Sequence, residues 1–188
     1  MKKILCLLLI LFMTFGLAGC DNGQIKGKHY VEMSVKDYGK IKLELDADVA
    51  PITVANFLKL VNEKFYDGTT FHRIIYGFMI QGGAPKDDKQ PETIVGEFSA
   101  NGHENNILHE RGVISMARAK SMDSASSQFF IVHQKSPHLD GNYAAFGKVI
   151  SGMSVVDKIA LVDPIPNSDG IVEEDKQPVI EYIRVVEK

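Results

Sequence analysis

Hydrophobic and polar residues alternate along two neighbouring stretches of the chain, Tyr30 to Val35 and Lys40 to Leu45. In the second stretch, Ile41, Leu43 and Leu45 are separated by charged residues, and a short segment that ends in a glycine joins the two stretches. Alternation with a period of two around such a turn predicts an antiparallel β-hairpin that buries one face and exposes the other.

A helical pattern follows the predicted hairpin. Pro51 suits the first turn of a helix, and apolar residues recur after it with the i, i+3, i+4, i+7 spacing of one helix face. These residues are Val54, Phe57, Leu58 and Val61. We expect this helix to cover apolar surface and to end at Asp67-Gly68. A second, shorter helix is predicted over Ser154–Ala160, where Val155, Val156 and Ile159 can share a face.

Short apolar runs in the rest of the chain predict strands rather than helices. They are Phe71–Ile75, Phe78–Gln81, Val113–Met116, Gln128–Val132, Ala144–Val149 and Val179–Val186. Many short strands with few helices are typical of an antiparallel barrel or sandwich. Segments 84–110 and 118–128 lack periodicity and are rich in Ser, Asn, Asp and Gly, so we expect long loops there, a common place for function. Segment 163–178, with three prolines and several acids, reads as a surface loop.

The N-terminus has the three zones of a secretory signal: Lys2-Lys3, an apolar run to Leu17, and the small residues before Cys20. Leu17-Ala18-Gly19-Cys20 also resembles the lipobox of bacterial lipoproteins, in which the cysteine is acylated. The apolar run is shorter than the roughly 20 residues that span a bilayer. We therefore expect a signal peptide over 1–19, a lipidated Cys20 with a short tether over 20–28, and a folded domain over 29–188, lipid-anchored to the cell membrane on its extracytoplasmic side.

Charge and cysteine content narrow the possible partners. Cleavage before Cys20 would remove Cys6, so no disulfide framework is expected in the mature domain. Cleavage would also remove two lysines and no acid, which takes the formal net charge from −3 to −5. An acidic domain offers no electrostatic reason to bind nucleic acid or anionic lipid, so membrane attachment would come from the acyl chains.

The candidate chemistry lies in segment 71–83, an apolar run that carries Arg73 and Gln81. The segment contains no acid, no cysteine, no serine and no threonine. Arginine stays protonated in proteins and cannot act as a general base. This inventory suits a site that grips a substrate and directs a fixed positive charge at it, and it favours a conformational reaction over bond breaking.

Four segments together extend this hypothesis. In chain order, they are Phe71-His72-Arg73 with Gly77 to Gly83, then Gly112 to Ala119, then Ser126 to Ile131, and then His138 to Gly141 with Phe146 to Val149. In order and spacing the chain resembles, from Tyr30 to Lys188, the cyclophilin family of peptidyl-prolyl cis–trans isomerases. The resemblance implies a mainly β fold, a closed eight-stranded antiparallel barrel capped by two helices. It also implies an isomerase that acts on proline-containing polypeptides, without a cofactor or metal and as a monomer.

The resemblance also assigns roles to individual residues. Arg73 matches the catalytic arginine, while Phe71 and His72 beside it look structural. The substrate-binding positions are Phe78, Met79, Gln81, Ala117, Arg118, Ala119, Gln128, Phe130, His138, Leu139 and Tyr143. Among them, Phe78, Met79, Phe130 and Leu139 match the walls of the pocket for the proline ring.

The chain also departs from the family's pattern. His138 stands where many members have a tryptophan that helps to hold cyclosporin, so we expect weak cyclosporin binding. Tyr143 replaces a histidine of many members but keeps an aromatic wall with a hydrogen-bonding tip. Ala84 to Asp88 replaces a glycine-rich stretch of many members, and Tyr76 replaces a common proline. We therefore expect a different preference for the substrate residues that precede the proline.

Other readings of the sequence remain open. The groove could serve as a binding module for proline-containing segments of a membrane or secreted partner, without turnover. A metal protein built on His103, His109, His133 and His138 is another reading, although their spacing matches no tight ligand motif. A serine hydrolase using Ser115, Ser126 or Ser127 would lack the Gly-x-Ser-x-Gly elbow. If exported, an isomerase would meet unfolded secreted chains, so assistance to proline-limited folding is the expected role.

Overall fold

The computed structural model describes residues 25–87 and 90–188, so the predicted signal peptide, Cys20 and the first part of the tether lie outside the described residues. Eight strands are present: β1 (Lys28–Val35), β2 (Gly39–Asp46), β3 (Phe71–Ile75), β4 (Met79–Gly82), β5 (Val113–Met116), β6 (Phe129–Val132), β7 (Ala145–Ser151) and β8 (Ile180–Val186). Two α-helices are present, α1 (Pro51–Asn62) and α2 (Met153–Ile159). The predicted strands and the shorter helix are confirmed within two residues at each end.

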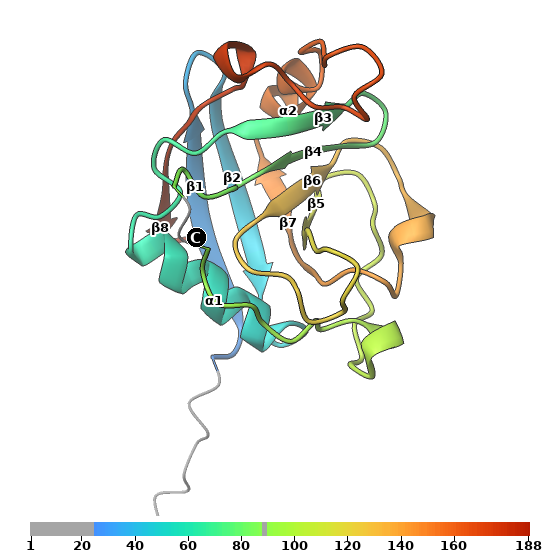
Figure 1. The fold of residues 1–188 in the computed structure, drawn as a ribbon. Coiled ribbons are helices and arrows are strands. Elements are labelled where there is room, and N and C mark those ends of the chain that lie inside the picture. Colours follow the sequence, from blue (N-terminus) through green and yellow to red (C-terminus); the bar gives the residue numbers. More distant parts are fainter. Residues whose placement is uncertain (1–24, 88–89) are drawn as a thin grey trace, which may run out of the picture.

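The eight strands form one antiparallel sheet in the order β3-β4-β6-β5-β7-β2-β1-β8. The sheet curls on itself, and its edge strands β3 and β8 do not pair along their length (Figure 1). Near them, one isolated bridge joins Thr70 to Val179, with hydrogen bonds from Phe71 N to Pro178 O and from Ile180 N to Thr69 O. The expected closed barrel is therefore wrong, and the fold is a curled half-barrel.

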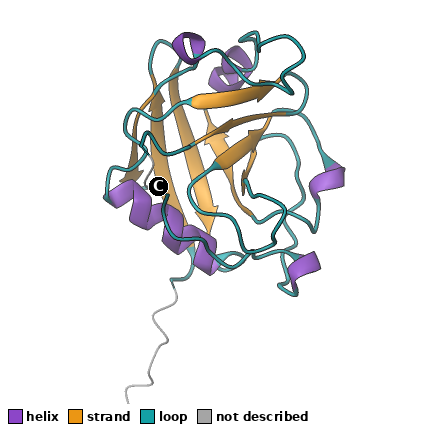
Figure 2. Ribbon diagram, viewed as in Figure 1, coloured by secondary structure: helices purple, strands orange, loops and turns teal. Residues whose placement is uncertain are grey.

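The helices lie at opposite ends of the curled sheet (Figure 2). At the start of α1, the buried Glu97 accepts hydrogen bonds from the backbone N–H groups of Ile52 (3.0 Å) and Thr53 (2.7 Å), which have no partner within the helix. The helix ends at Asn62, five residues before the predicted end. Lys64 adopts a left-handed φ of 57°, and a turn then leads to Gly68, so the apolar spacing outlasts the helix.

The main core lies inside the curled sheet. Phe57 of α1 packs against Tyr66, Phe129 and Phe146, with ring centroids 5.1 to 5.7 Å apart. The alternating residues of β2 that the sequence predicts to be buried are fully buried. The predicted hairpin is also confirmed, with β1 and β2 paired from Lys28–Asp46 to Val35–Gly39.

A second, smaller apolar cluster lies on the opposite face of the sheet. Successive side chains of a strand point to opposite faces, so Phe129 and Ile131 of β6 join the main core whereas Phe130 and Val132 join the smaller cluster. In β4, Ile80 belongs to the core and Met79 to the smaller cluster. In both β4 and β6, therefore, one set of alternating residues packs into the main core and the other set forms the smaller apolar cluster.

The two long loops are fastened to each other. Ile94 and Ala125 form an isolated bridge, and Asp123 accepts hydrogen bonds from Gly96 N (3.0 Å) and Asn101 Nδ2 (2.8 Å). These contacts join residues 94–101 of the first loop to residues 123–125 of the second. Among the described residues, no helix has the length and hydropathy that would suit a membrane crossing.

A buried hydrogen-bonded chain lies beneath the smaller cluster. The His109 ring contacts Asp140 through Nδ1 (2.9 Å) and Ser115 through Nε2 (3.1 Å), and it stacks on Phe130 at 5.9 Å between centroids. Burial lowers the pKa of His109, and the hydrogen bond with Asp140 opposes that shift only in part. Burial raises the pKa of Asp140, but hydrogen bonds from His109 outweigh it and the net pKa is lowered. The pair is therefore a neutral ring held by a carboxylate at neutral pH.

We predict that the free energy of unfolding decreases as pH decreases below about 6.5, the ordinary pKa of an unfolded histidine. Below this pH the unfolded chain binds a proton at His109, while the native His109 stays neutral until its own lower pKa is reached. Each such histidine therefore changes the free energy of unfolding by at most about 1.4 kcal/mol per pH unit. Half-buried His72 adds in the same direction. The free energy of unfolding can be measured by urea denaturation at several pH values between 7.5 and 5.0. Its dependence on pH should be weaker in His109→Gln than in the wild type.

The half-buried His103 supplies the matched control, because His103→Gln removes a ring that makes no contact with Asp140 or Ser115. The control should keep the wild-type slope. An unchanged slope in His109→Gln would contradict the assignment of the pH dependence to the buried chain.

Candidate active site

The smaller apolar cluster borders a cavity of about 120 Å³ on the outer face of the sheet. Nine residues line it: Arg73, Phe78, Met79, Gln81, Ala117, Arg118, Phe130, Leu139 and Tyr143. They come from β3, β4, β6, the turn between β3 and β4, and the loops that follow β5 and β6. The structure thus brings together nine of the twelve residues that the sequence assigns to catalysis and substrate binding.

A β-bulge directs Arg73 into this cavity. Phe71 pairs with Gly82 and Arg73 with Gln81, so two steps along β3 oppose one step along β4, and His72 is the extra residue. Without the bulge, Phe71 and Arg73 would share a face. With it, Phe71 is fully buried in the main core and Arg73 faces outward beside Gln81. Burial lowers the pKa of His72, so this ring is neutral at pH 7.

The apolar walls of the cavity are formed by well-packed side chains. Met79, Phe130 and Leu139 are buried, and Phe130 meets Tyr143 edge to face at 5.8 Å. His138 does not line the cavity; its exposed ring lies 5.2 Å from that of Phe78, outside the wall. A ring-sized apolar group would fit this space with little rearrangement of the walls.

Polar side chains run along one rim of the cavity. Arg73 Nη1 donates to Gln81 Oε1 at 3.4 Å, and Gln81 Nε2 donates to Gln128 Oε1 at 3.0 Å. The next residue, Gly82, has no room for a side chain, because a Cβ would lie 2.9 Å from the carbonyl oxygen of Thr70. The close approach of β4 to β3 at this glycine sets the position of Gln81 relative to Arg73.

Arg118 separates this cavity from a neighbouring one of about 310 Å³. Its guanidinium donates to the carbonyl oxygen of Asn142 (2.9 and 3.1 Å) and lies 4.7 Å from the centre of the Tyr143 ring. The neighbouring cavity contains the two remaining predicted positions, Ala119 and Gln128. The two cavities form one groove, apolar at one end and polar at the other.

Sequence reasoning missed one contact of Arg73. Arg73 Nε donates to the backbone oxygen of Asp169 at 2.9 Å, and Nη2 donates to its carboxylate at 3.0 Å. Asp169 lies 96 residues after Arg73, in the loop that the sequence predicts only as a surface connection. No local pattern could reveal this contact, because it depends on how that loop packs against β3.

The residues of the rival readings have other positions. Ser115 and Ser127 are fully buried, so no substrate could reach them, and Ser126 lines the polar cavity without a histidine neighbour in its lining. His133 accepts a hydrogen bond from Gly77 N and lies 3.3 Å from Asp157. In the part of the chain that the structure describes, no group of three or more His, Cys, Asp or Glu is placed to hold a metal ion.

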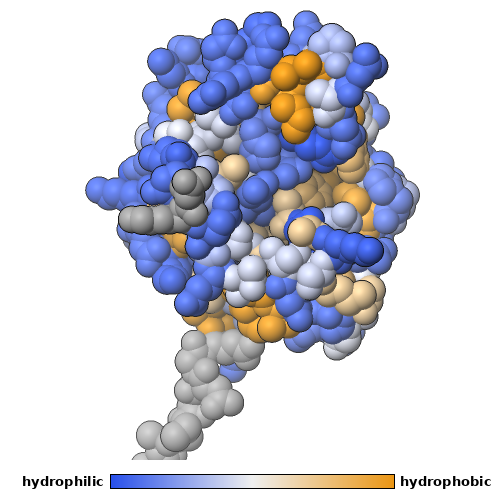
Figure 3. Space-filling view, in the orientation of Figure 1, coloured by the Kyte–Doolittle hydropathy of each residue, from blue (hydrophilic) through white to orange (hydrophobic). Residues whose placement is uncertain are grey.

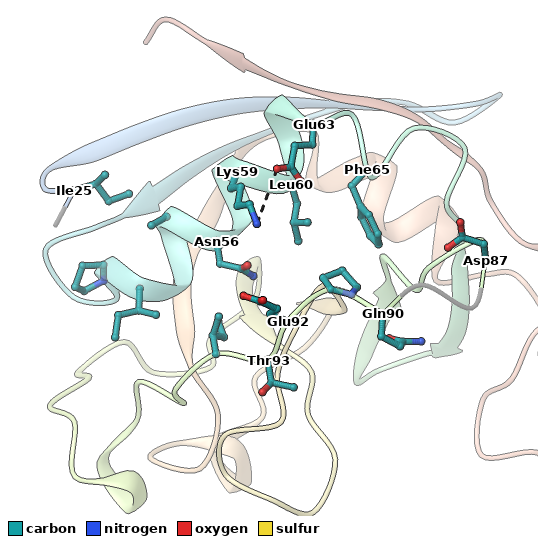
Figure 4. A pocket seen from close by; sticks show the side chains of 15 residues that line it. Ile25, Asn56, Lys59, Leu60, Glu63, Phe65, Asp87, Gln90, Glu92 and Thr93 are labelled. Carbon is teal, nitrogen blue, oxygen red and sulfur yellow. Dashed lines mark ion pairs between the residues drawn. The ribbon is translucent and has the colours of Figure 1, made fainter. Parts of the chain in front are cut away.

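A larger cavity lies elsewhere. About 690 Å³ opens between α1 and segment 90–94, where Asn56, Lys59 and Glu63 line one side and Glu92 the other (Figure 4). The face shown in Figure 3 is mostly hydrophilic, with hydrophobic residues in separate small patches. Size alone would select the α1 cavity, but Arg73 and the apolar walls are in the smaller one.

The groove can bind and orient but has few means to break bonds. None of the nine residues that line the apolar cavity is an acid, a cysteine, a serine, a threonine or a histidine, and the polar cavity adds two serines, Ser124 and Ser126, but no acid, cysteine or histidine. What it offers is a fixed cation, an amide and a dry apolar wall.

Comparisons with known proteins agree with this geometry. Residues 30–185 match the family model described as cyclophilin type peptidyl-prolyl cis-trans isomerase/CLD. The chain is 50% identical over 122 residues to peptidyl-prolyl cis-trans isomerase B of Bacillus subtilis, covering 63% of this chain and 82% of that protein. It is 42% identical over 156 residues to a peptidyl-prolyl cis-trans isomerase of Acinetobacter baylyi, covering 79% and 80%.

A solved structure shows the same arrangement of the backbone. The cyclophilin type peptidyl-prolyl cis-trans isomerase of Cryptosporidium parvum aligns with a TM-score of 0.74 and 28% identity, over 86% of this chain and 99% of that one. The same isomerase has also been crystallised in the presence of the dipeptide Ala-Pro, and that structure aligns with a TM-score of 0.73. By the match over most of its length and the identity to its relatives, the chain belongs to the cyclophilin-type peptidyl-prolyl cis–trans isomerase family.

Proposed function

We propose that this protein catalyses rotation about X-Pro bonds of exported polypeptides, with Arg73 as the catalytic residue. The observation that carries the proposal is the guanidinium of Arg73 at the edge of an apolar cavity whose lining contains no acid, cysteine, serine, threonine or histidine. The proline ring would occupy the space between Met79, Phe130 and Leu139. Gln81, Gln128 and the backbone from Ala117 to Ala119 would hold the flanking chain.

The energetics divide the work between the arginine and the pocket. Amide resonance sets a barrier of roughly 18–20 kcal/mol, and rotation in milliseconds requires about 7 kcal/mol of selective transition-state stabilisation. In the twisted state the prolyl nitrogen regains its lone pair, and an N–H of Arg73 directed at it stabilises that state more than the planar ones. One charge-assisted hydrogen bond contributes about 1.5–3 kcal/mol. Preorganisation by the pocket must supply the rest.

We further propose that the protein acts at the outer face of the cytoplasmic membrane, held there by lipid on Cys20. The support is the signal-like N-terminus and its lipobox-like end, Leu17 to Cys20. Seven residues join Cys20 to β1, so the domain would stay within about 28 Å of the membrane surface. The protein would act as a monomer on secreted chains while those chains fold. The proposal of weak cyclosporin binding is supported by His138, which stands where many members of the family have a tryptophan.

We expect Arg73→Ala to lower the catalysed exchange rate of a proline peptide at least tenfold while its dissociation constant changes less than threefold. Phe130→Ala should impair both, because it removes a wall of the cavity. Exchange NMR on the purified protein gives the rate, and titration of the same peptide gives the affinity. Arg184→Ala, which truncates an arginine on β8 that pairs with Asp67, is the control and should keep both values.

Two outcomes would count against this assignment. Equal losses from Arg73→Ala and Phe130→Ala would mean that the cation is only part of the binding surface. Peptide binding without catalysed exchange in the wild type would make the groove a proline-recognition module.

Lipidation can be tested with a matched pair of cysteine variants. In bacteria grown with an alkyne-labelled fatty acid, the wild type and Cys6→Ser should carry the label and sediment with membranes. Cys20→Ser should lose the label, because it removes the thiol that would be acylated. Label that persists in Cys20→Ser, or disappears in Cys6→Ser alone, would refute the assigned lipidation site.

A further inference from the structure

We propose that Asp169 is a positioning residue for Arg73: it holds the guanidinium in the orientation that directs its remaining N–H groups into the apolar cavity. The inference rests on the proposed function of Arg73 and adds a partner that the family comparisons do not assign. It is carried by three observations: the contacts of the guanidinium, the conformation of the turn that bears Asp169, and the attachment of that turn to β3.

The contacts fix the plane of the guanidinium. Asp169 accepts from Nε through its backbone oxygen (2.9 Å) and from Nη2 through its carboxylate (3.0 Å), while Gln81 accepts from Nη1 at 3.4 Å. A guanidinium is planar, so two short hydrogen bonds to one residue determine its orientation. Arginine has five N–H groups, and three are occupied here, which leaves two for a substrate.

The turn that bears Asp169 has an unusual backbone. Asn167 and Asp169 both adopt left-handed φ angles, 61° and 57°, and Gly170 follows at 89°. Asparagine, aspartate and glycine are the residues that tolerate this conformation. A Cβ on Gly170 would lie 2.5 Å from Cγ1 of Ile75, so the turn also needs glycine to approach β3.

The turn is bonded to β3 on both sides of Arg73. Ile74 N donates to Gly170 O at 2.7 Å, and Val172 N donates to His72 O at 3.0 Å. Arg73 itself forms an isolated bridge with Ile171. Asp169 is thus placed by backbone hydrogen bonds to the residues that flank Arg73, and its position does not depend on the flexible reach of a surface side chain.

Exposure indicates what this contact can contribute. The Asp169 side chain is 83% exposed and that of Arg73 23% exposed, so water screens much of their attraction. A screened ion pair adds little stability, yet it still restricts the orientation of a long side chain. The consequence should appear in turnover, where the direction of an N–H matters, and hardly in stability or in peptide affinity.

Three variants in the turn test the proposal. Asp169→Gly and Asp169→Asn both tolerate the left-handed φ, and the asparagine keeps one acceptor oxygen for Nη2. We expect Asp169→Gly to lower kcat roughly three- to tenfold with KM changed less than twofold, and Asp169→Asn to lie between it and the wild type. Asn167→Gly, in the same turn and without a contact to Arg73, is the control and should match the wild type.

A double variant separates positioning from a general effect on the fold. If Asp169 acts through Arg73, Asp169→Gly should slow the wild type but cause no further loss in an Arg73→Ala background. An equal loss in both backgrounds, or an unchanged kcat in Asp169→Gly, would overturn the proposal. So would a higher kcat, which would make Asp169 a competitor for the cation.

NMR of the arginine side chain adds a measurement that does not depend on turnover. The Nη2 hydrogens of Arg73, which donate to the Asp169 carboxylate, should be protected from exchange with water in the wild type and in Asn167→Gly, and they should lose that protection in Asp169→Gly, whereas Nε–H keeps its backbone acceptor. An unprotected signal in the wild type would overturn the proposal. If the wild type shows no catalysed exchange at all, the proposed function fails, and that result is distinct from a failure of Asp169 in an active enzyme.

Discussion

The rest of the structure depends on one constraint: β4 and β6 each contribute side chains to both the main core and the cavity. In each strand, one set of side chains completes the main core and the alternate set forms the cavity, with Phe129 inside and Phe130 outside. A change of register by one residue would exchange the two sets and destroy both surfaces at once. Stability and the site are therefore specified by the same strand pairing, and β4 with β6 cannot be adjusted for one without the other.

Three local features in or next to β4 and β6 shape the cavity on the outer face of the sheet. The bulge at His72 turns Arg73 outward while Phe71 stays in the core. Gly82 lets β3 and β4 approach closely, and the His109 ring supports Phe130 from below. Of the three, the bulge departs from regular sheet geometry at a position next to the cavity, where natural folds often place irregularity.

Local patterns in the sequence were enough to predict the hairpin from alternation, both helices from their apolar spacing, and the other six strands from short apolar runs. The end of α1 was wrong, since the apolar spacing persists beyond the left-handed Lys64. The cavity residues came from matching motifs, not from spacing. The open edges of the curled sheet, the bulge and the Asp169 contact could not be predicted locally, because each is decided by how distant segments meet.

The attachment of segment 170–172 to β3 has a consequence for handling foreign chains. β3 is an edge strand of the sheet, and an uncovered edge presents unpaired N–H and C=O groups to which another polypeptide can add as a strand. Here Gly170 and Val172 already occupy the hydrogen-bonding groups of Ile74 and His72. A protein proposed to work among unfolded polypeptides thus keeps this edge closed to them, which guards against co-aggregation with its own clients.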